Sequence, residues 1–239
     1  MSRDRIQELQ QPRNYSSSNN SRDSTNRPIE MSARSNAPAN DFAGEVRLLT
    51  QLDKATRYTS SIDRKIDQIA SLHERALVAV GQDEINRTTA QVDALQAETN
   101  QMMDKVRRCL SNLSNETNRM RGNQVNARKA QQATVARKLM DVARKYEKVQ
   151  QKYKLKYQQR ITREIRIARP DASVEEVNYA LQSGNTAVFA QEMIQGRSGD
   201  QRRVLEQVQT RHDELMKIEQ SVEQLATLFQ DMQVLLEVF

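Results

Sequence analysis

Residues 204–239 of this 239-residue chain read VLEQVQTRHDELMKIEQSVEQLATLFQDMQVLLEVF. Apolar residues recur in this stretch in steps of three and four, the spacing of a heptad seam on one face of a helix. The seam residues are Leu215, Ile218, Val222, Leu225, Phe229, Met232, Leu236 and Phe239, and upstream the same steps pass through Arg211 to Val208 and Val204. The spacing predicts a helix whose narrow apolar face must be covered by other helices. We expect this seam to be part of a longer helix.

The charged residues in the second half of this stretch lie off the predicted seam. They are Glu214, Lys217, Glu219, Glu223, Asp231 and Glu237. Periodicity alone fits two interpretations equally well, a seam that pairs with partner helices and an amphipathic helix of an ordinary bundle.

The composition favours an all-α protein of long, thin helices. With 37% apolar and 28% charged residues, 4% aromatic residues and no Trp, the chain cannot fill a large globular core. The single Cys109 excludes a disulfide framework and a Cys-based metal cluster, which suits a reducing compartment. No apolar run approaches the ~18 residues needed to span a bilayer, and the first residues lack an apolar signal core. We therefore expect a soluble chain.

The net charge of +6 is unevenly distributed along the sequence. Residues 121–169 hold fifteen Lys or Arg and three Asp or Glu, a net charge of +12. Residues 200–239 hold four Lys or Arg and eight Asp or Glu, a net charge of −4. The two segments can attract each other, and the basic one can also meet acidic lipid headgroups or nucleic acid. The simplest interpretation of most of these charges is a solvated helix face.

Three helices are predicted between residues 41 and 167. This region contains no proline, and Gly81 and Gly122 mark two turns at similar intervals. The helices would cover 41–79, 83–120 and 124–167, each roughly 57–66 Å long. Because the turns are short, the three must form an antiparallel bundle, and the terminal helix of similar length can dock in its groove as a fourth. We expect the apolar stripe of the first helix to begin with Phe42, Val46 and Leu49 and to continue through Leu52.

The linker 168–203 is predicted to contain short helices. Pro170 ends the third helix, and Ser173-Val174-Glu175-Glu176 is a capping box that starts a short helix closing before Gly184. Residues 185–194 indicate another short turn or helix.

The N-terminal residues 1–9 differ in character from residues 10–40. The segment Asp4-Arg5-Ile6-Gln7-Glu8-Leu9 combines charges with two aliphatic anchors, which suits a short peptide that grips a pocket. Residues 10–40 are rich in Ser, Asn, Arg and Pro and are predicted to be disordered. Such a leash reaches roughly 30 Å and keeps the peptide close to whatever the folded part binds.

The sequence offers little chemistry, so we expect no cofactor, no metal and no enzymatic activity. It has no glycine-rich phosphate loop, and its two histidines, His73 and His212, have no metal-ligand spacing and are expected at the surface or in the groove. Cys109 is interpreted as a small core residue. Tyr146, Tyr153 and Tyr157 interleave with lysines, but their spacing follows the buried stripe and favours core packing over base stacking.

Four segments, in this order, resemble the plasma-membrane syntaxins. Asp4-Arg5-Ile6-Gln7-Glu8-Leu9 is similar to the syntaxin N-peptide, and the bundle, including residues 66–77, is similar to the regulatory Habc domain. Residues 183–190, SGNTAVFA, resemble the syntaxin linker. RHDELMKIEQSVEQL at 211–225, with LFQDM at 228–232, resembles the N-terminal half of the SNARE motif. The resemblance covers nearly the whole chain apart from residues 10–40.

The resemblance implies a Qa-type target-membrane SNARE at the cytosolic face of the plasma membrane, with a role in vesicle docking and exocytosis. Its seam residues would form layers with a vesicle SNARE and other target SNARE helices. In a closed state the same helix would pack on Habc, and a Sec1/Munc18-type protein would clasp both and bind the N-peptide through Asp4, Arg5, Ile6 and Leu9. The linker latch would comprise Leu181, Gln182 and Phe189.

The resemblance has two departures and also implies parts that this sequence does not include. Phe239 stands where the family has a central-layer glutamine, and Gln182 stands where it has a glutamate. The sequence would end within the SNARE motif, before the membrane anchor. Two other functions stay open from the residues alone, a passive coiled-coil scaffold or tether and a basic helical bundle that binds nucleic acid.

Overall fold

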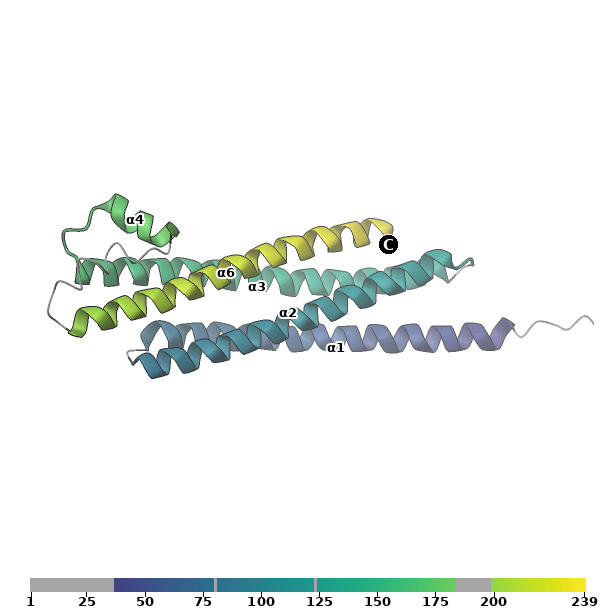
Figure 1. Ribbon diagram of the computed structural model, residues 1–239. Coiled ribbons are helices and arrows are strands. Elements are labelled where there is room, and N and C mark those ends of the chain that lie inside the picture. The colour runs from purple at the N-terminus through teal and green to yellow at the C-terminus, as the bar shows by residue number, and fades with distance from the viewer. Residues whose placement is uncertain (1–36, 80, 123, 184–198) are drawn as a thin grey trace, which may run out of the picture. The chain divides into compact units, whose positions relative to one another are not determined.

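The computed structural model describes residues 37–79, 81–122, 124–183 and 199–239 (Figure 1). The chain divides into two compact units, Met1–Asn40 and Asp41–Phe239, and the features below belong to the second. In the described parts of the chain all regular elements are helices, as the sequence predicts.

Of the helices in the described ranges, four are long and one is short. The three bundle helices are α1 (Ala37–Val78), α2 (Gln82–Arg119) and α3 (Val125–Ala168), followed by the short α4 (Val174–Ser183) and the long α6 (Gly199–Val238). The four long helices begin and end within about five residues of the bounds expected from apolar periodicity and turn residues.

Local chemistry explains where these helices end. Gly122 lies between α2 and α3 with a φ of 132°, a conformation that side chains with a Cβ rarely adopt. At the start of α4, the Glu176 backbone N–H donates to Ser173 Oγ at 3.1 Å, and the Ser173 backbone N–H donates to Glu176 Oε2 at 2.7 Å. The predicted capping box is therefore formed, and it satisfies two backbone donors at the helix start.

The three bundle helices run antiparallel to their sequence neighbours. Lys65 of α1 pairs with Glu98 of α2 at 2.6 Å, and Lys145 of α3 pairs with Asp63 of α1 at 2.8 Å. Side chains of the heptad-like stripes fill the space between the helices, and Tyr146 of α3 is fully buried there. The result is the antiparallel three-helix bundle expected from the two short turns.

Two clusters of buried apolar side chains form the core. The larger joins α1, α2, α3 and the second half of α6, and includes Ile62, Leu110, Leu139 and Met232. The smaller joins the end of α1, the second half of α3, α4 and the first half of α6; its buried members are Leu77, Tyr153, Tyr157, Ile161, Ile165, Val177, Ala180, Val208, Leu215 and Ile218. Burial of the three tyrosines confirms that they pack in the core.

The predicted start of the α1 stripe is wrong. Phe42 is 73% exposed, and Val46 and Leu49 are also exposed, whereas Leu48 and Leu52 are buried. The buried face of α1 passes through these two leucines, which turns Val46 and Leu49 outward. The pair Arg47–Glu116 shows that α2, which ends at Arg119, reaches only to about residue 44 of α1, so Phe42 extends beyond the end of α2.

Candidate functional site

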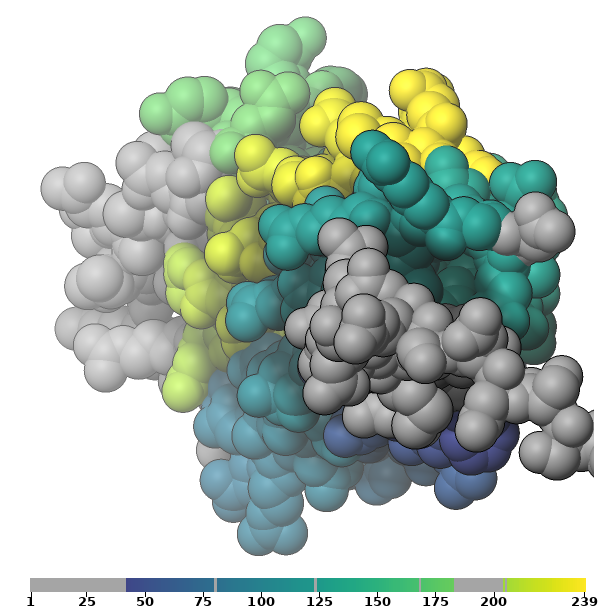
Figure 2. Space-filling model, turned by 90° about the vertical axis from the view of Figure 1, so that its right-hand side faces the viewer, coloured from purple at the N-terminus to yellow at the C-terminus, as the bar shows by residue number. Residues whose placement is uncertain are grey.

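The candidate site is the interface between α6 and the bundle. Cross-helix contacts place α6 antiparallel to α3, with Lys154–Glu219 at 2.9 Å and Glu164–Arg211 at 3.2 Å. In Figure 1 α6 runs along α3, and in Figure 2 its yellow surface adjoins the teal surface of the bundle helices. The apolar face of α6 is therefore covered by helices of its own chain.

Contacts with α2 show that α6 also lies beside this helix and runs parallel to it. Lys217 pairs with Asp93 at 2.7 Å, and the Asn100 side-chain amide donates to Gln224 Oε1 at 2.8 Å. The sequence separation is 124 residues in both contacts, which means that the two helices stay in one register over these two turns.

The predicted seam residues fall into two groups in this interface. Leu215, Ile218, Leu225 and Met232 are buried, while Val222, Phe229, Leu236 and Phe239 are half-buried. Named as heptad positions, 218, 225 and 232 are d positions, and 222, 229 and 236 are a positions. The bundle thus buries the d positions Ile218, Leu225 and Met232, leaves the last d residue, Phe239, half-buried, and leaves most of the a positions at the edge of the interface.

Three residues that stand one position before the a residues Leu215, Val222 and Phe229 are also buried. These g positions are Glu214, Ser221 and Leu228, and all three are buried. The face of α6 that docks on the bundle is therefore rotated from the a/d seam toward the g positions. Sequence analysis placed Glu214 off the seam and did not single out Ser221 or Leu228, because the a/d spacing by itself does not show which flank of the seam meets the bundle.

Arg211, on the upstream continuation of the seam, is buried with its charge compensated. Only 1% of its surface is exposed, and its Nη1 lies 3.2 Å from Glu164 Oε2. Its Nη2 also donates to the Ala79 carbonyl at 3.4 Å, and Arg160 Nε pairs with the same Glu164 carboxylate at 2.6 Å. Burial lowers the pKa of Arg211, against the raising effect of Glu164. Removal of Glu164 would leave the buried Arg211 guanidinium without a charged partner, whereas removal of Arg211 would leave Glu164 paired with Arg160.

Glu214 is the second buried charge of α6. Lys217 Nζ donates to Glu214 Oε1 at 2.9 Å and to Asp93 Oδ2 of α2 at 2.7 Å, so one ammonium bridges two carboxylates. Burial raises the pKa of the Glu214 carboxyl to about 7, although the hydrogen bond from Lys217 lowers it. The carboxylate therefore titrates close to neutral pH while α6 is docked.

His73 and His212 are both buried, which excludes the surface position and leaves the groove position of the two that the sequence allowed. His73 Nδ1 lies 3.3 Å from Tyr157 Oη, and its ring stacks on Tyr153 with centroids 4.8 Å apart. Burial lowers the pKa of His73 to about 4, against the adjacent Glu74 carboxylate, which raises it. His73 is therefore a neutral core residue at physiological pH.

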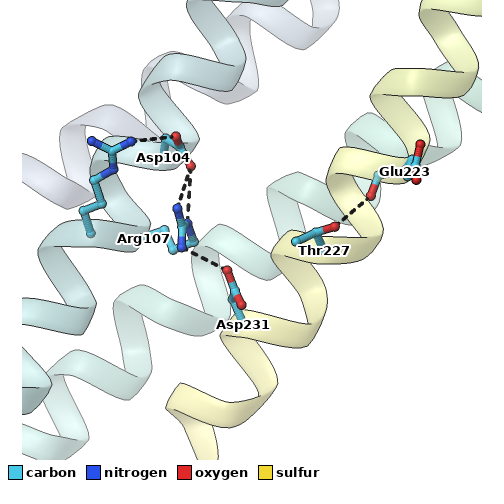
Figure 3. Close-up of polar contacts among 6 residues, drawn as sticks. Asp104, Arg107, Glu223, Thr227 and Asp231 are labelled. Atoms are coloured by element: carbon cyan, nitrogen blue, oxygen red, sulfur yellow. Dashed lines mark hydrogen bonds and ion pairs between the residues drawn. The ribbon is translucent and has the colours of Figure 1, made fainter.

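A cleft of about 640 Å³ separates α2 from the second half of α6. Arg107 Nη1 pairs with Asp231 of α6 at 2.9 Å, and its Nη2 pairs with Asp104 at 3.1 Å, as Figure 3 shows. Thr227, on the cleft side of α6, donates to the Glu223 carbonyl at 3.3 Å and makes no link to α2 in that view. Exposed pairs of this kind contribute about 0–1 kcal/mol, so they add little to the stability of the docked α6.

The overall charge contrast between α3 and α6 contributes little direct pairing. Among the described residues, Lys154–Glu219 has the sense expected from the basic third helix, and Glu164–Arg211 has the opposite sense. Apolar burial therefore accounts for most of the docking energy, at about 1.5–3 kcal/mol for each fully buried Leu, Ile, Val or Phe.

Only some of the remaining predicted site residues lie within the described ranges. Leu181 is half-buried against the smaller core cluster, and Gln182 is exposed. Phe189, the N-peptide residues Asp4, Arg5, Ile6 and Leu9, and the predicted turn at 185–194 lie outside the described residues. Cys109 is half-buried between α1 and α2, where burial raises the pKa of its thiol.

The described residues form neither a metal-binding cluster nor a membrane-spanning helix. No group of three or more His, Cys, Asp or Glu side chains in this part of the chain is arranged to hold a metal ion. None of the helices in the described ranges is both long and apolar enough to cross a bilayer.

Comparisons with known proteins point consistently to one family. No family model matches the chain. It is 28% identical over 210 residues to the syntaxin-like protein psy1 of Schizosaccharomyces pombe, covering 83% of this chain and 74% of that protein. It is 26% identical over 208 residues to the protein SSO1 of Saccharomyces cerevisiae, covering 86% and 69%.

A solved structure has the same fold. The chain matches a chain of the Unc18–syntaxin 1 complex from Monosiga brevicollis with a TM-score of 0.66 and 21% identity, covering 83% of this chain and 89% of that one. At this identity the likeness shows the fold alone.

Proposed function

Since the chain is a syntaxin-like protein and not an enzyme, we propose that it is a target-membrane SNARE whose α6 is held closed against its own bundle. In this proposal the seam residues of α6 pair with a vesicle SNARE and other target SNARE helices once α6 leaves the bundle. The chain would act in exocytosis at the cytosolic face of the plasma membrane. The burial of Leu215, Ile218, Leu225 and Met232 within the chain carries the proposal, because the same side chains are needed by partner helices.

We propose that a Sec1/Munc18-type protein binds the closed state and holds α6 against the bundle. The fold match is to a syntaxin chain from a complex with Unc18, which supports this partner class. The segment Asp4–Leu9 would provide a second contact with the same protein. Because the two contacts are joined by a leash, loss of the peptide lowers the overall affinity by removing the gain in effective concentration.

Deletion of residues 1–9 tests the peptide contact. We expect the shortened chain to bind a Sec1/Munc18-type protein of a related organism more weakly than the full chain, in isothermal titration calorimetry. Deletion of nine residues from the leash, 16–24, is the matched control, and it should leave the affinity nearly unchanged. Equal affinity of all three chains would refute the role of the peptide, and absence of binding by the full chain would refute the partner class.

Leu228→Ala tests the closed state separately from SNARE pairing. Leu228 is buried against the bundle but lies at a g position, outside the predicted SNARE layers. Truncation of a buried leucine costs about 2–5 kcal/mol, so α6 should leave the bundle more often and assemble faster with partner SNARE helices. Phe229→Ala is the contrasting variant, because Phe229 is a layer residue that is only half-buried in the docked state.

The assembly rate decides between the outcomes. In a fluorescence assay of SNARE complex formation, Leu228→Ala should speed assembly and Phe229→Ala should weaken the assembled complex. If Leu228→Ala does not change the rate, docking of α6 does not restrain assembly and the closed-state proposal fails. Stable self-association of the free chain in sedimentation would instead support a passive coiled-coil scaffold.

A further inference from the structure

The outward face of α3 carries a straight line of basic side chains. Positions 137, 141, 144, 148, 152, 155, 159, 163 and 166 follow one another in steps of four and three, which places them on one side of the helix. All nine are exposed. We call this set the α3 outer stripe; its members are Arg137, Asp141, Arg144, Lys148, Lys152, Leu155, Gln159, Arg163 and Arg166.

The charge of the α3 outer stripe is nearly uncompensated. It holds six cations and one carboxylate over a length of about 44 Å. Arg144 pairs with Asp141 at 3.2 Å, and Lys152 lies 3.6 Å from Glu74. The other four cations form no ion pair with any side chain in the described part of the chain. A line of free cations on a rigid helix attracts an anionic surface at every point along its length.

The stripe also exposes aliphatic side chains among its cations. Leu155 lies within it and is 60% exposed, and Ile167 beside it is 66% exposed. Together with Arg163 and Arg166 they border an open groove of about 490 Å³, all of whose lining residues belong to α3. Basic side chains with interspersed aliphatic ones are the pattern of a helix that lies on a lipid headgroup layer.

We propose that the α3 outer stripe is a binding surface for anionic membrane lipid. Its cations would contact headgroup phosphates and carboxylates, and Leu155 and Ile167 would enter the headgroup layer. Nucleic acid is the less favoured partner, because the tyrosines that could stack on bases, Tyr153 and Tyr157, are buried. The stripe lies on the helix face opposite the buried stripe of α3, so its use does not require α6 to leave the bundle.

The inference goes beyond the proposed function and rests on it only for placing the chain near a membrane. If α3 lies against the membrane, the bundle takes a fixed orientation, with one defined side facing away from the membrane. The vesicle assay below contains neither SNARE partners nor a Sec1/Munc18-type protein. Its failure would therefore leave the tests of the closed state untouched.

Vesicle cosedimentation of the full chain tests the surface. We expect binding to vesicles of phosphatidylcholine with phosphatidylserine, little binding to phosphatidylcholine alone, and loss of binding as salt is raised. Each cation near an anionic surface changes the partition by about fivefold, so K148Q/R163Q should weaken binding about 25-fold. L155Q should weaken binding further without changing the charge.

The matched control is R64Q/R87Q, which removes two exposed charges from α1 and α2. We expect it to keep most of the vesicle binding. Equal losses in the two double variants would mean that net charge and not the stripe is responsible, and would overturn the proposal. Absence of vesicle binding at low salt, or binding of a DNA duplex that K148Q/R163Q abolishes in place of vesicle binding, would overturn it as well.

Discussion

The replacement Glu214→Gln should strengthen the docking of α6 at alkaline pH and leave it unchanged at acidic pH. Glu214 is only 2% exposed, and its carboxyl has a pKa of about 7 in place of 4.5. Between pH 4.5 and 7 the docked state keeps a proton that the undocked state has released. The stability gained from this proton is fully present below pH 4.5 and is lost as the pH rises through 7.

The size of the effect follows from the same pKa. At about 1.4 kcal/mol for each pH unit between 4.5 and 7, the ionised carboxylate costs on the order of 3 kcal/mol above pH 7. A glutamine of the same shape never ionises, so it avoids this cost. It still accepts a hydrogen bond from Lys217, which keeps Asp93 as its charged partner.

Urea unfolding followed by circular dichroism at pH 5 and pH 8 measures the difference. We expect Glu214→Gln and the unchanged chain to have similar unfolding free energies at pH 5, and the variant to be more stable at pH 8 by up to about 3 kcal/mol. Glu223→Gln, an exposed position on the same helix, is the control and should stay within about 0.5 kcal/mol at both pH values. If Glu214→Gln is instead less stable at pH 8, the ion pair with Lys217 outweighs burial and the reasoning is wrong.

Three further changes separate the forces in the bundle. Ile218→Ala should lower the unfolding free energy by about 2–5 kcal/mol in urea titrations, while Val234→Ala, at an exposed position, should change it by less than about 0.5; similar losses would contradict the burial of Ile218. Because the pKa of His73 is lowered to about 4, the unfolded chain takes up a proton first and stability falls from pH 6.5 toward 4. His73→Phe should remove this dependence in thermal unfolding, and an unchanged pH profile would exclude His73 as its source. Arg107→Gln, which breaks the pair with Asp231, should cost less than about 1 kcal/mol, and a larger loss would show that the pair holds α6 in place.

Sequence periodicity predicts the helices of this chain well because their boundaries are set locally. Gly81, Gly122 and Pro170 interrupt the helical pattern at points where the chain must turn, and the capping box at Ser173 fixes the start of α4. These signals need no knowledge of distant residues. The core positions of Tyr146 and its neighbours follow from the same periodicity, since one stripe of each bundle helix must face inward.

The face on which α6 docks could not be predicted in this way. An a/d seam shows that one side of a helix is apolar, but the g positions beside it are equally close to a neighbouring helix. Lys217, which pairs with the buried Glu214, also pairs with Asp93 of α2, and the buried Arg211 pairs with Glu164 of α3; Asp93 and Glu164 are both remote in sequence from α6. The exposure of Phe42 likewise depends on where the neighbouring α2 ends, which the stripe of α1 does not record.

The buried charges of α6 do what its apolar seam cannot do, which is to fix the register on the bundle. A slip of seven residues in one direction would bring another apolar residue to each place that a buried apolar residue of α6 now fills, so apolar burial would change little. The same slip would move Arg211 into the place of Val204 and separate it from Glu164. Breaking a buried ion pair costs about 3–5 kcal/mol, more than a single aliphatic layer contributes. The pair therefore selects one register among several of similar apolar energy, even though it adds little to the docking energy itself.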